Sequence, residues 1–150
     1  MNQHAIILKA FDLILKHKIW EDKTPSEILK ILMYLHTKGW LYIPVVDGKI
    51  EAIIAAYRIE YINDSSLVKI PVTEIGNTLY VPLALNLSDK SLYRTIRNSL
   101  KSYLEDNPNV NEIVFEELRT NKIKRHKLNK GASYGKQKRA RVTSDTNISN

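Results

Sequence analysis

The stretch "TLYVPLALNLSDKSLYRTIRNSLKSYL", residues 78–104, decides how the chain folds because it joins a predicted strand to a predicted helix. Residues 78–85 are rich in aromatic and aliphatic side chains, which favours a strand. Further on, apolar side chains recur at the spacing of one helix face, at Leu92, Ile96, Leu100 and Leu104. We expect Ser88 or Asp89 to cap this helix. The loop "NLSDKSLY" (86–93) therefore leads into the N-terminus of the predicted helix, a position at which many proteins bind phosphate groups.

Two amphipathic helices are predicted before this stretch. Residues 4–18 carry apolar side chains at helical spacing, at Ile7, Phe11, Ile14 and Leu15. In "TPSE" (24–27), Thr24 suits the cap position and Glu27 suits the position that bonds back to the Thr24 backbone. An apolar helix face follows, and Gly39 suits the residue after the helix.

Four strands are predicted over residues 40–85, as an antiparallel meander. Two-residue turns typical of β-hairpins separate them in pairs, at Asp47-Gly48 and Gly76-Asn77. The expected strands are "WLYIPVV" (40–46), "KIEAIIAAYRIEYI" (49–62), "LVKIPVTEI" (67–75) and "TLYVPLAL" (78–85). Proline cannot donate to a sheet, so Pro44, Pro71 and Pro82 each predict an edge, a bulge or a splayed pair.

The C-terminal part predicts one more strand and one more helix. The strand is "NEIVFEEL" (111–118), and "TNKIKRHKLNKG" (120–131) predicts a short basic helix that ends at Gly131. We therefore expect one α+β domain of the three-layer type over residues 1–131, with a mostly antiparallel central sheet and helices on both faces. A basic, polar tail would follow over residues 132–150.

The positive charge is concentrated near the C-terminus. Residues 1–118 hold 13 Lys/Arg and 15 Asp/Glu, whereas residues 119–141 hold ten Lys/Arg and no acid. The ten are Arg119, Lys122, Lys124, Arg125, Lys127, Lys130, Lys136, Lys138, Arg139 and Arg141. Such a segment is either a solvated tail or a surface that binds nucleic acid or an acidic protein.

Several classes of site and location are excluded or disfavoured. The absence of cysteine excludes disulfides, cysteine-based zinc sites and thiol nucleophiles. His4, His17, His36 and His126 have no metal-ligand spacing, so we expect no metal. No apolar run approaches the roughly 20 residues that span a bilayer, and Lys9 and Asp12 interrupt the start of the chain. We expect a cytoplasmic or virion protein that is neither secreted nor membrane-bound.

The predicted order of elements resembles the GCN5-related N-acetyltransferase (GNAT) fold over residues 4–131. The hairpin "VVDGKIEAIIAAY" (45–57) is similar to the family's early hairpin. The segment "NEIVFEELRTNKIKRHKLNKG" (111–131) is similar to the family's strand, Asn-initiated helix and terminal glycine. In that family, the strand before the long helix splays at a bulge where the pantetheine arm of acetyl-coenzyme A enters. The resemblance places Pro82 at that bulge, and a proline on an edge strand is the alternative.

The resemblance also places a phosphate loop at "NLSDKSLY", where the family has the pattern Gln/Arg-x-x-Gly-x-Gly/Ala. Neither glycine is present here, and Asp89 puts a negative charge beside the expected pyrophosphate. Ser88, Lys90 and Ser91 would be the donors if acetyl-coenzyme A were bound. We expect that no cofactor is bound, because charged hydrogen bonds worth about 1.5–3 kcal/mol each would be lost.

The catalytic residues implied by the resemblance are also altered. The family's general acid is a tyrosine four residues before the final glycine, and that position holds Lys127, with His126 beside it. If the chain were an enzyme, His126 would be the candidate proton donor and Glu116 the candidate base. Glu74 and Glu117 are further candidates, and each of these acids is otherwise a solvent-facing strand residue.

Three functions follow from these expectations. The first is a non-catalytic GNAT-like structural or assembly protein, because some tailed phages carry small GNAT-like virion components. Its basic tail would dock on subunits of a larger assembly, on other copies of the chain, or on nucleic acid. The second is an acetyl-coenzyme A-dependent N-acetyltransferase with a divergent phosphate loop. The third is a nucleic-acid-binding protein, although Tyr134 is the only aromatic residue of the tail and provides no stacking platform.

Overall fold

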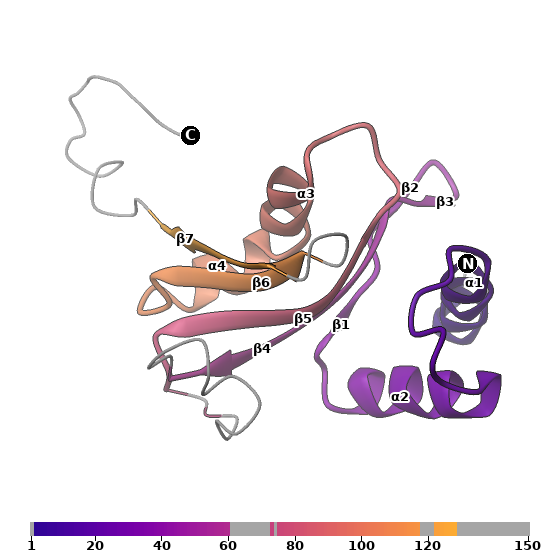
Figure 1. The fold of residues 1–150 in the computed structure, drawn as a ribbon. Helices are drawn as coiled ribbons and strands as arrows, with labels where there is room; N and C mark the ends of the chain where they lie inside the picture. Colours follow the sequence, from indigo (N-terminus) through magenta and orange to yellow (C-terminus); the bar gives the residue numbers. More distant parts are fainter. Residues whose placement is uncertain (1, 61–72, 74, 118–121, 129–150) are drawn as a thin grey trace. The chain divides into compact units, whose positions relative to one another are not determined.

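The computed structural model describes residues 2–60, 73, 75–117 and 122–128, and within them the chain is a mixed α+β protein (Figure 1). The helices are α1 (Gln3–Lys16), α2 (Pro25–Thr37), α3 (Leu92–Ser99) and α4 (Lys101–Asp106). The strands are β1 (Leu41–Tyr42), β2 (Val45–Val46), β3 (Lys49–Ile50), β4 (Ala52–Ile59), β5 (Thr78–Asn86), β6 (Glu112–Glu117) and β7 (Lys122–Lys127). The predicted fold class is confirmed at this level.

Five of the strands form one sheet in the order β1-β4-β5-β6-β7, and β2 and β3 form a separate pair. The pairs β1–β4 and β6–β7 are antiparallel. The start of β4 lies beside the end of β5, because Leu87 N–H donates to the Glu51 carbonyl at 2.9 Å. By contrast, Asn111 N–H donates to the Asn77 carbonyl at 2.9 Å, so β5 and β6 begin at the same end and run parallel. The sheet is therefore mostly antiparallel, as predicted.

The chain divides into two compact units. Unit 1 is Met1–Tyr57 with Val81–Tyr103, and unit 2 is Arg58–Tyr80 with Leu104–Asn150. The division runs through β4 and β5, which contribute residues to both units.

Unit 1 is built around the two N-terminal helices. The capping box that "TPSE" predicted is present, because Thr24 Oγ1 accepts from Glu27 N–H and Glu27 Oε1 accepts from Thr24 N–H. A buried stripe of α1 and a buried stripe of α2 belong to one core, which contains Ile7, Ala10, Ile14, Ile28, Leu32, Leu35, Ile53 and Leu83. Leu15 is 39% exposed, so its expected place on the buried stripe is wrong. Ala10 is buried instead, because positions 7, 10 and 14 line one helix face.

The early hairpin of unit 1 has the predicted turn and shorter strands than predicted. Asp47 and Gly48 have φ of 51° and 77°, and Val46 pairs with Lys49 across them. Residues 40–46 do not form one strand, because Pro44 separates β1 from β2. Glu51 likewise divides the predicted strand 49–62 into β3 and β4. Within the described residues, the strands expected to form one meander therefore belong to two sheets, the pair β2–β3 and the five-stranded sheet.

The N-cap of the helix after β5 lies three residues later than the first expected cap. Ser91 is the N-cap, and its side chain accepts from Arg94 N–H at 3.2 Å. The expected caps Ser88 and Asp89 are therefore wrong. The helix is also interrupted at Leu100, which ends α3 before α4 begins. Three of the four residues of its predicted apolar face, Ile96, Leu100 and Leu104, are buried, and the fourth, Leu92, is half-buried.

Unit 2 contains the main correction to the sequence prediction. The part of the expected basic helix 120–131 that the structure describes is the strand β7, which pairs along its whole length with β6. Ile113, Val114 and Phe115 of β6 are buried, and their backbone groups need partners, which β7 supplies on one side. Local helix propensity is weak enough for this pairing to override it. The predicted strand 67–75 lies outside the described residues except for Thr73 and Ile75.

Candidate functional site

The loop after β5, where the resemblance placed a phosphate site, forms a network of hydrogen bonds within unit 1. Asn86 Oδ1 accepts from Ser88 N–H at 3.0 Å, from Ser88 Oγ at 2.7 Å and from Thr95 Oγ1 at 3.1 Å. Asn86 Nδ2 donates to the Lys90 carbonyl at 2.7 Å, and Lys90 N–H donates to Ser88 Oγ at 3.2 Å. These bonds close the loop into local turns in which side chains satisfy backbone groups.

This geometry bears on the three residues expected to hold a coenzyme phosphate. The Ser88 hydroxyl bonds Asn86 and lies 3.0 Å from Thr95 Oγ1. The Ser91 hydroxyl caps α3. The Lys90 amide is bonded inside the loop, and Asp89 is exposed at the loop surface. A phosphate that accepted from the Ser88 hydroxyl or from the Lys90 amide would have to displace these bonds, and it would lie near the Asp89 carboxylate.

The two candidate catalytic residues lie on different faces of the β6–β7 hairpin. Ile113 pairs with His126 and Glu116 pairs with Ile123, and side chains alternate along a strand. His126 therefore shares a face with Ile113 and Phe115, whereas Glu116 shares the opposite face with Val114. A proton relay between His126 and Glu116 is excluded by this register, and Lys127, which the resemblance aligned with a catalytic tyrosine, lies on a strand.

His126 is packed as an aromatic residue within the hairpin. Its ring stacks on Phe115, with ring centroids 5.5 Å apart and an angle of 5° between the planes. Burial lowers the pKa of His126, and the nearby charge of Lys124 lowers it further. The imidazole is therefore held toward its neutral form, which suits a packing role.

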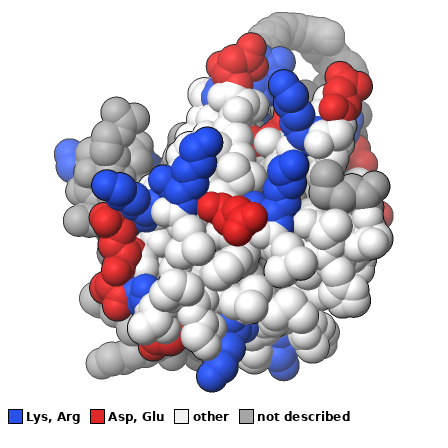
Figure 2. Space-filling model, turned by 90° about the vertical axis from the view of Figure 1, so that its right-hand side faces the viewer, with Lys and Arg blue, Asp and Glu red and all other residues white. Residues whose placement is uncertain are grey.

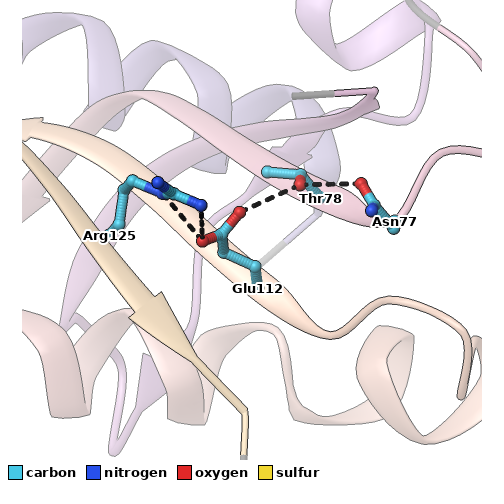
Figure 3. A network of polar contacts seen from close by, with 4 residues as sticks. All are labelled: Asn77, Thr78, Glu112 and Arg125. Carbon is cyan, nitrogen blue, oxygen red and sulfur yellow. Dashed lines mark hydrogen bonds and ion pairs between the residues drawn. The ribbon is translucent and has the colours of Figure 1, made fainter. Parts of the chain in front are cut away.

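A buried carboxylate lies at the start of β6 (Figure 3). Glu112 Oε1 accepts from Arg125 Nε at 2.8 Å and lies 2.7 Å from Arg125 Nη2. The Glu112 side chain is 7% exposed and the Arg125 side chain 48% exposed. Thr78 Oγ1 lies 3.3 Å from Glu112 Oε2 and 3.0 Å from Asn77 Oδ1. The network links the starts of β5 and β6 to β7, and it neutralises one of the cations on β7.

The described part of the expected basic binding surface is β7 itself. Lys122, Lys124, Arg125 and Lys127 are exposed there. Alternation puts Lys122 and Lys124 on one face and Arg125 and Lys127 on the other. We call this strand with its four cations the basic edge. The remaining predicted binding residues lie outside the described residues: Arg119, Lys130, Lys136, Lys138, Arg139 and Arg141.

Charge is distributed differently on the side of the molecule where α1 lies. Figure 2 shows single lysine or arginine side chains there, interspersed with acidic side chains on a mostly uncharged surface. A surface of mixed sign is ordinary for a soluble domain and does not select a charged partner. The basic edge is the more informative surface, because four of the six residues of β7 are cations.

Several residues of these networks were not singled out from the sequence. Glu112 stands in an apolar strand shortly before a basic run, and this contrast is the signal that could have identified it. Asn86 and Thr95 have no such signal, because each resembles an ordinary polar loop or helix residue. Glu74 and the side chain of Glu117 lie outside what the structure describes.

In the described residues, no group of three or more His, Cys, Asp or Glu side chains is arranged to hold a metal ion. The helices there are also too short or too polar to cross a membrane. No protein-family model matches the chain, and no curated protein or solved structure matches it either.

Proposed function

We propose that this chain is a non-catalytic binding protein that docks on an acidic partner through the basic edge and the basic segment around it. The observation that carries the proposal is the placement of four exposed cations, of which Arg125 is paired with Glu112, on the last strand of the sheet within the described residues. Ten positive charges without an acid over residues 119–141 extend the same field along the sequence. The chain would then be a structural or assembly component with a GNAT-like arrangement, as in phage virions.

The loop after β5 supports the non-catalytic part of the proposal. The Ser88 hydroxyl and the amides of Ser88 and Lys90 are bonded within the loop, so a pyrophosphate that used these donors would have to break these bonds. The Asp89 carboxylate would repel the same ligand. The order from α1 to β6 is in keeping with the GNAT likeness, whereas β7 replaces the helix on which part of that likeness rested.

An acetyl-coenzyme A-dependent N-acetyltransferase is the second candidate. The strand–loop–helix arrangement of β5 and α3 favours it, because that is where the family holds its coenzyme. The chain would then bind acetyl-coenzyme A despite the absence of glycine in the loop.

Calorimetry with two ligands tests both candidates. We expect no saturable binding of acetyl-coenzyme A below about 1 mM, which corresponds to a binding free energy of about −4 kcal/mol. We expect a poly-glutamate chain or a DNA duplex to bind, with an affinity that falls as salt is added. A micromolar dissociation constant for acetyl-coenzyme A would overturn the non-catalytic proposal in favour of the enzyme.

A matched pair of variants tests the surface. Lys122→Glu with Lys124→Glu reverses two charges of the basic edge, and Lys9→Glu with Lys16→Glu reverses two exposed charges on α1. The net charge changes equally in both, so a general charge effect would weaken polyanion binding equally. We expect the first pair to weaken binding by at least tenfold and the second to have a much smaller effect. Equal effects would remove the basic edge from the proposal.

A further inference from the structure

The backbone of β7 presents hydrogen-bonding groups on the side away from β6. Leu128 N–H donates to the Asn111 carbonyl at 2.8 Å, so Asn111 and Leu128 form a hydrogen-bonded pair. The next pair along the two strands is Glu112–Lys127. In an antiparallel ladder, hydrogen-bonded and non-hydrogen-bonded pairs alternate. The pair Glu112–Lys127 is therefore a non-hydrogen-bonded pair, and the pair Ile113–His126 is a hydrogen-bonded pair. By the same alternation, Ile123 and Arg125 also belong to non-hydrogen-bonded pairs. The backbone N–H and C=O groups of Ile123, Arg125 and Lys127 point away from β6.

This side of β7 is the end of the sheet within the described residues, because β7 is the last strand in the order. An edge strand with outward N–H and C=O groups is a template for pairing with another strand. Extended peptides bind such edges by adding a strand, in which main-chain bonds supply affinity and alternate side chains supply specificity. The outward groups of Ile123 and Lys127 lie toward the two ends of the basic edge.

The charges of the basic edge select the occupant. An added strand lies about 4.8 Å from β7, so its side chains would lie directly beside Lys122 and Lys124 on one face and Arg125 and Lys127 on the other. A second copy of β7 would place cations against cations. The chain's own residues 129–150 hold five Lys/Arg and one acid, so they would also be repelled. The charges thus disfavour self-pairing and favour an acidic strand.

We propose that the outer edge of β7 accepts an extended acidic segment of a partner protein as an additional β-strand. This inference rests on the proposed function and specifies its partner. Acidic residues of the segment would pair with Lys122 and Lys124 on one face and with Lys127 on the other, because Arg125 is paired with Glu112. The backbone of the segment would bond the outward groups of Ile123 and Lys127. Nucleic acid would be attracted by the same charges, but it has no alternating N–H and C=O groups to match an open strand edge.

Proline scanning of β7 separates strand addition from attraction by charge alone. Ile123→Pro removes an N–H that points away from β6, and edge strands tolerate proline at such positions. Ile123→Ala is the matched control, because it also loses the side chain but keeps the N–H. Neither variant changes the charge. Lys124→Pro removes an N–H that bonds β6, so the unfolding midpoint of this variant should fall. Such a fall would confirm that the N–H of Lys124 points toward β6 and the N–H of Ile123 points away from it.

The probe is a fluorescein-labelled peptide of alternating glutamate and valine, added to the full-length chain and followed by fluorescence anisotropy. We expect Ile123→Pro to bind it at least tenfold more weakly than Ile123→Ala, with circular dichroism unchanged between the two. We expect both variants to bind a DNA duplex equally. Equal binding of the peptide by both variants would overturn strand addition.

A second measurement covers the case in which Ile123→Pro does not fold. The same peptide with N-methyl groups on every second residue keeps its charge but cannot donate from one edge. In an extended peptide, the N–H groups of odd-numbered and even-numbered residues point to opposite edges. A peptide methylated on the odd residues alone or on the even residues alone can still pair through its other edge. A peptide methylated on every residue cannot donate from either edge. We expect only the fully methylated peptide to lose binding to the wild-type chain by at least tenfold. Undiminished binding of the fully methylated peptide would overturn the inference.

The proposed function can survive that failure. It stands if reversing the charges of Lys122 and Lys124 to glutamate still weakens polyanion binding.

Discussion

Gly76 is a residue whose lack of a side chain decides the local structure of unit 2. Its carbonyl accepts from Arg58 Nε at 3.0 Å and from Arg58 Nη2 at 2.6 Å, and Arg58 is only 7% exposed. A Cβ at position 76 would lie 2.6 Å from the Ile59 carbonyl carbon and still closer to its oxygen. Because both neighbours are backbone atoms, the clash cannot be relieved by a rotamer change.

Gly76→Ala should therefore lower the free energy of unfolding by about 3 kcal/mol, the upper part of the usual range for overpacking. Urea denaturation followed by circular dichroism measures the loss. Ile75→Ala is the control, because Ile75 is 85% exposed and its truncation should cost less than about 0.5 kcal/mol. Similar midpoints for the two variants would show that position 76 has room for a side chain.

His126 should give unit 2 a pH-dependent stability. Burial and the charge of Lys124 lower its pKa, so the unfolded chain binds the proton more tightly than the folded chain. The stabilising contribution of the neutral imidazole is complete above the ordinary value of about 6.5 and is lost as the pH falls toward the lowered pKa. Urea midpoints between pH 7.5 and 5 would measure this loss.

His126→Phe is the matched variant for that titration, because it keeps a ring beside Phe115 but cannot bind a proton. The fall in midpoint between pH 7.5 and 5 should be smaller in His126→Phe than in the wild type. A direct check is the titration of the His126 ring by NMR. An apparent pKa above about 6.5 would show that burial does not lower the pKa of His126.

At the scale of one element, α3 presents a buried face and an exposed face. Ile96 is fully buried, whereas Arg97 is exposed and lies over the Tyr93 ring, 6.0 Å from its centroid. Ile96→Ala should cost about 2–5 kcal/mol of unfolding free energy because it leaves a cavity. Arg97→Ala should cost under about 1 kcal/mol, since an exposed cation–π contact is weak. Chemical denaturation of both variants measures the difference, and equal costs would contradict the assignment of the two faces.

The hairpin β6–β7 shows why an element can be misread from its own residues. "KIKRHK" has neither a helical apolar face nor a full apolar alternation, so its own pattern does not select a strand. The buried strand β6 selects the strand conformation for these residues, because its backbone groups require a partner and its Glu112 requires a cation.

At the scale of the whole molecule, the C-terminal residues should contribute to binding more than to stability. Deleting residues 133–150 removes Lys136, Lys138, Arg139 and Arg141 and few apolar side chains. We expect the melting temperature to stay nearly unchanged. Binding to a DNA duplex should weaken, and its salt dependence should flatten by up to about four charge units, because each neutralised phosphate contributes about 0.9 to the slope. Calorimetric melting and binding titrations at several salt concentrations measure the two effects.

Scrambling residues 133–150 is the control for that deletion. Attraction by charge should survive scrambling, whereas docking through a specific contact of the tail should not. A truncated chain that binds as well as the full chain at low and high salt would remove these residues from the mechanism. The basic edge would then account for binding without them.

The sequence by itself determined the features whose physics is local. Thr24 and Glu27 cap α2 through bonds between residues three apart, and Asp47-Gly48 turns because its backbone adopts positive φ. The helical stripes of α1, α2 and α3 follow from apolar spacing, and the excess of cations after residue 118 is a matter of counting.

The tertiary structure alone decided the features that depend on distant partners. It selected Ser91 over Ser88 as the cap, because Asn86 and Thr95 bond the Ser88 hydroxyl. It placed His126 and Glu116 on opposite faces and put four of the predicted cations on β7, the last strand of the sheet within the described residues. The physical reason is that strand pairing satisfies backbone groups across the chain, so a strand's identity and its faces depend on the neighbour as much as on its own residues.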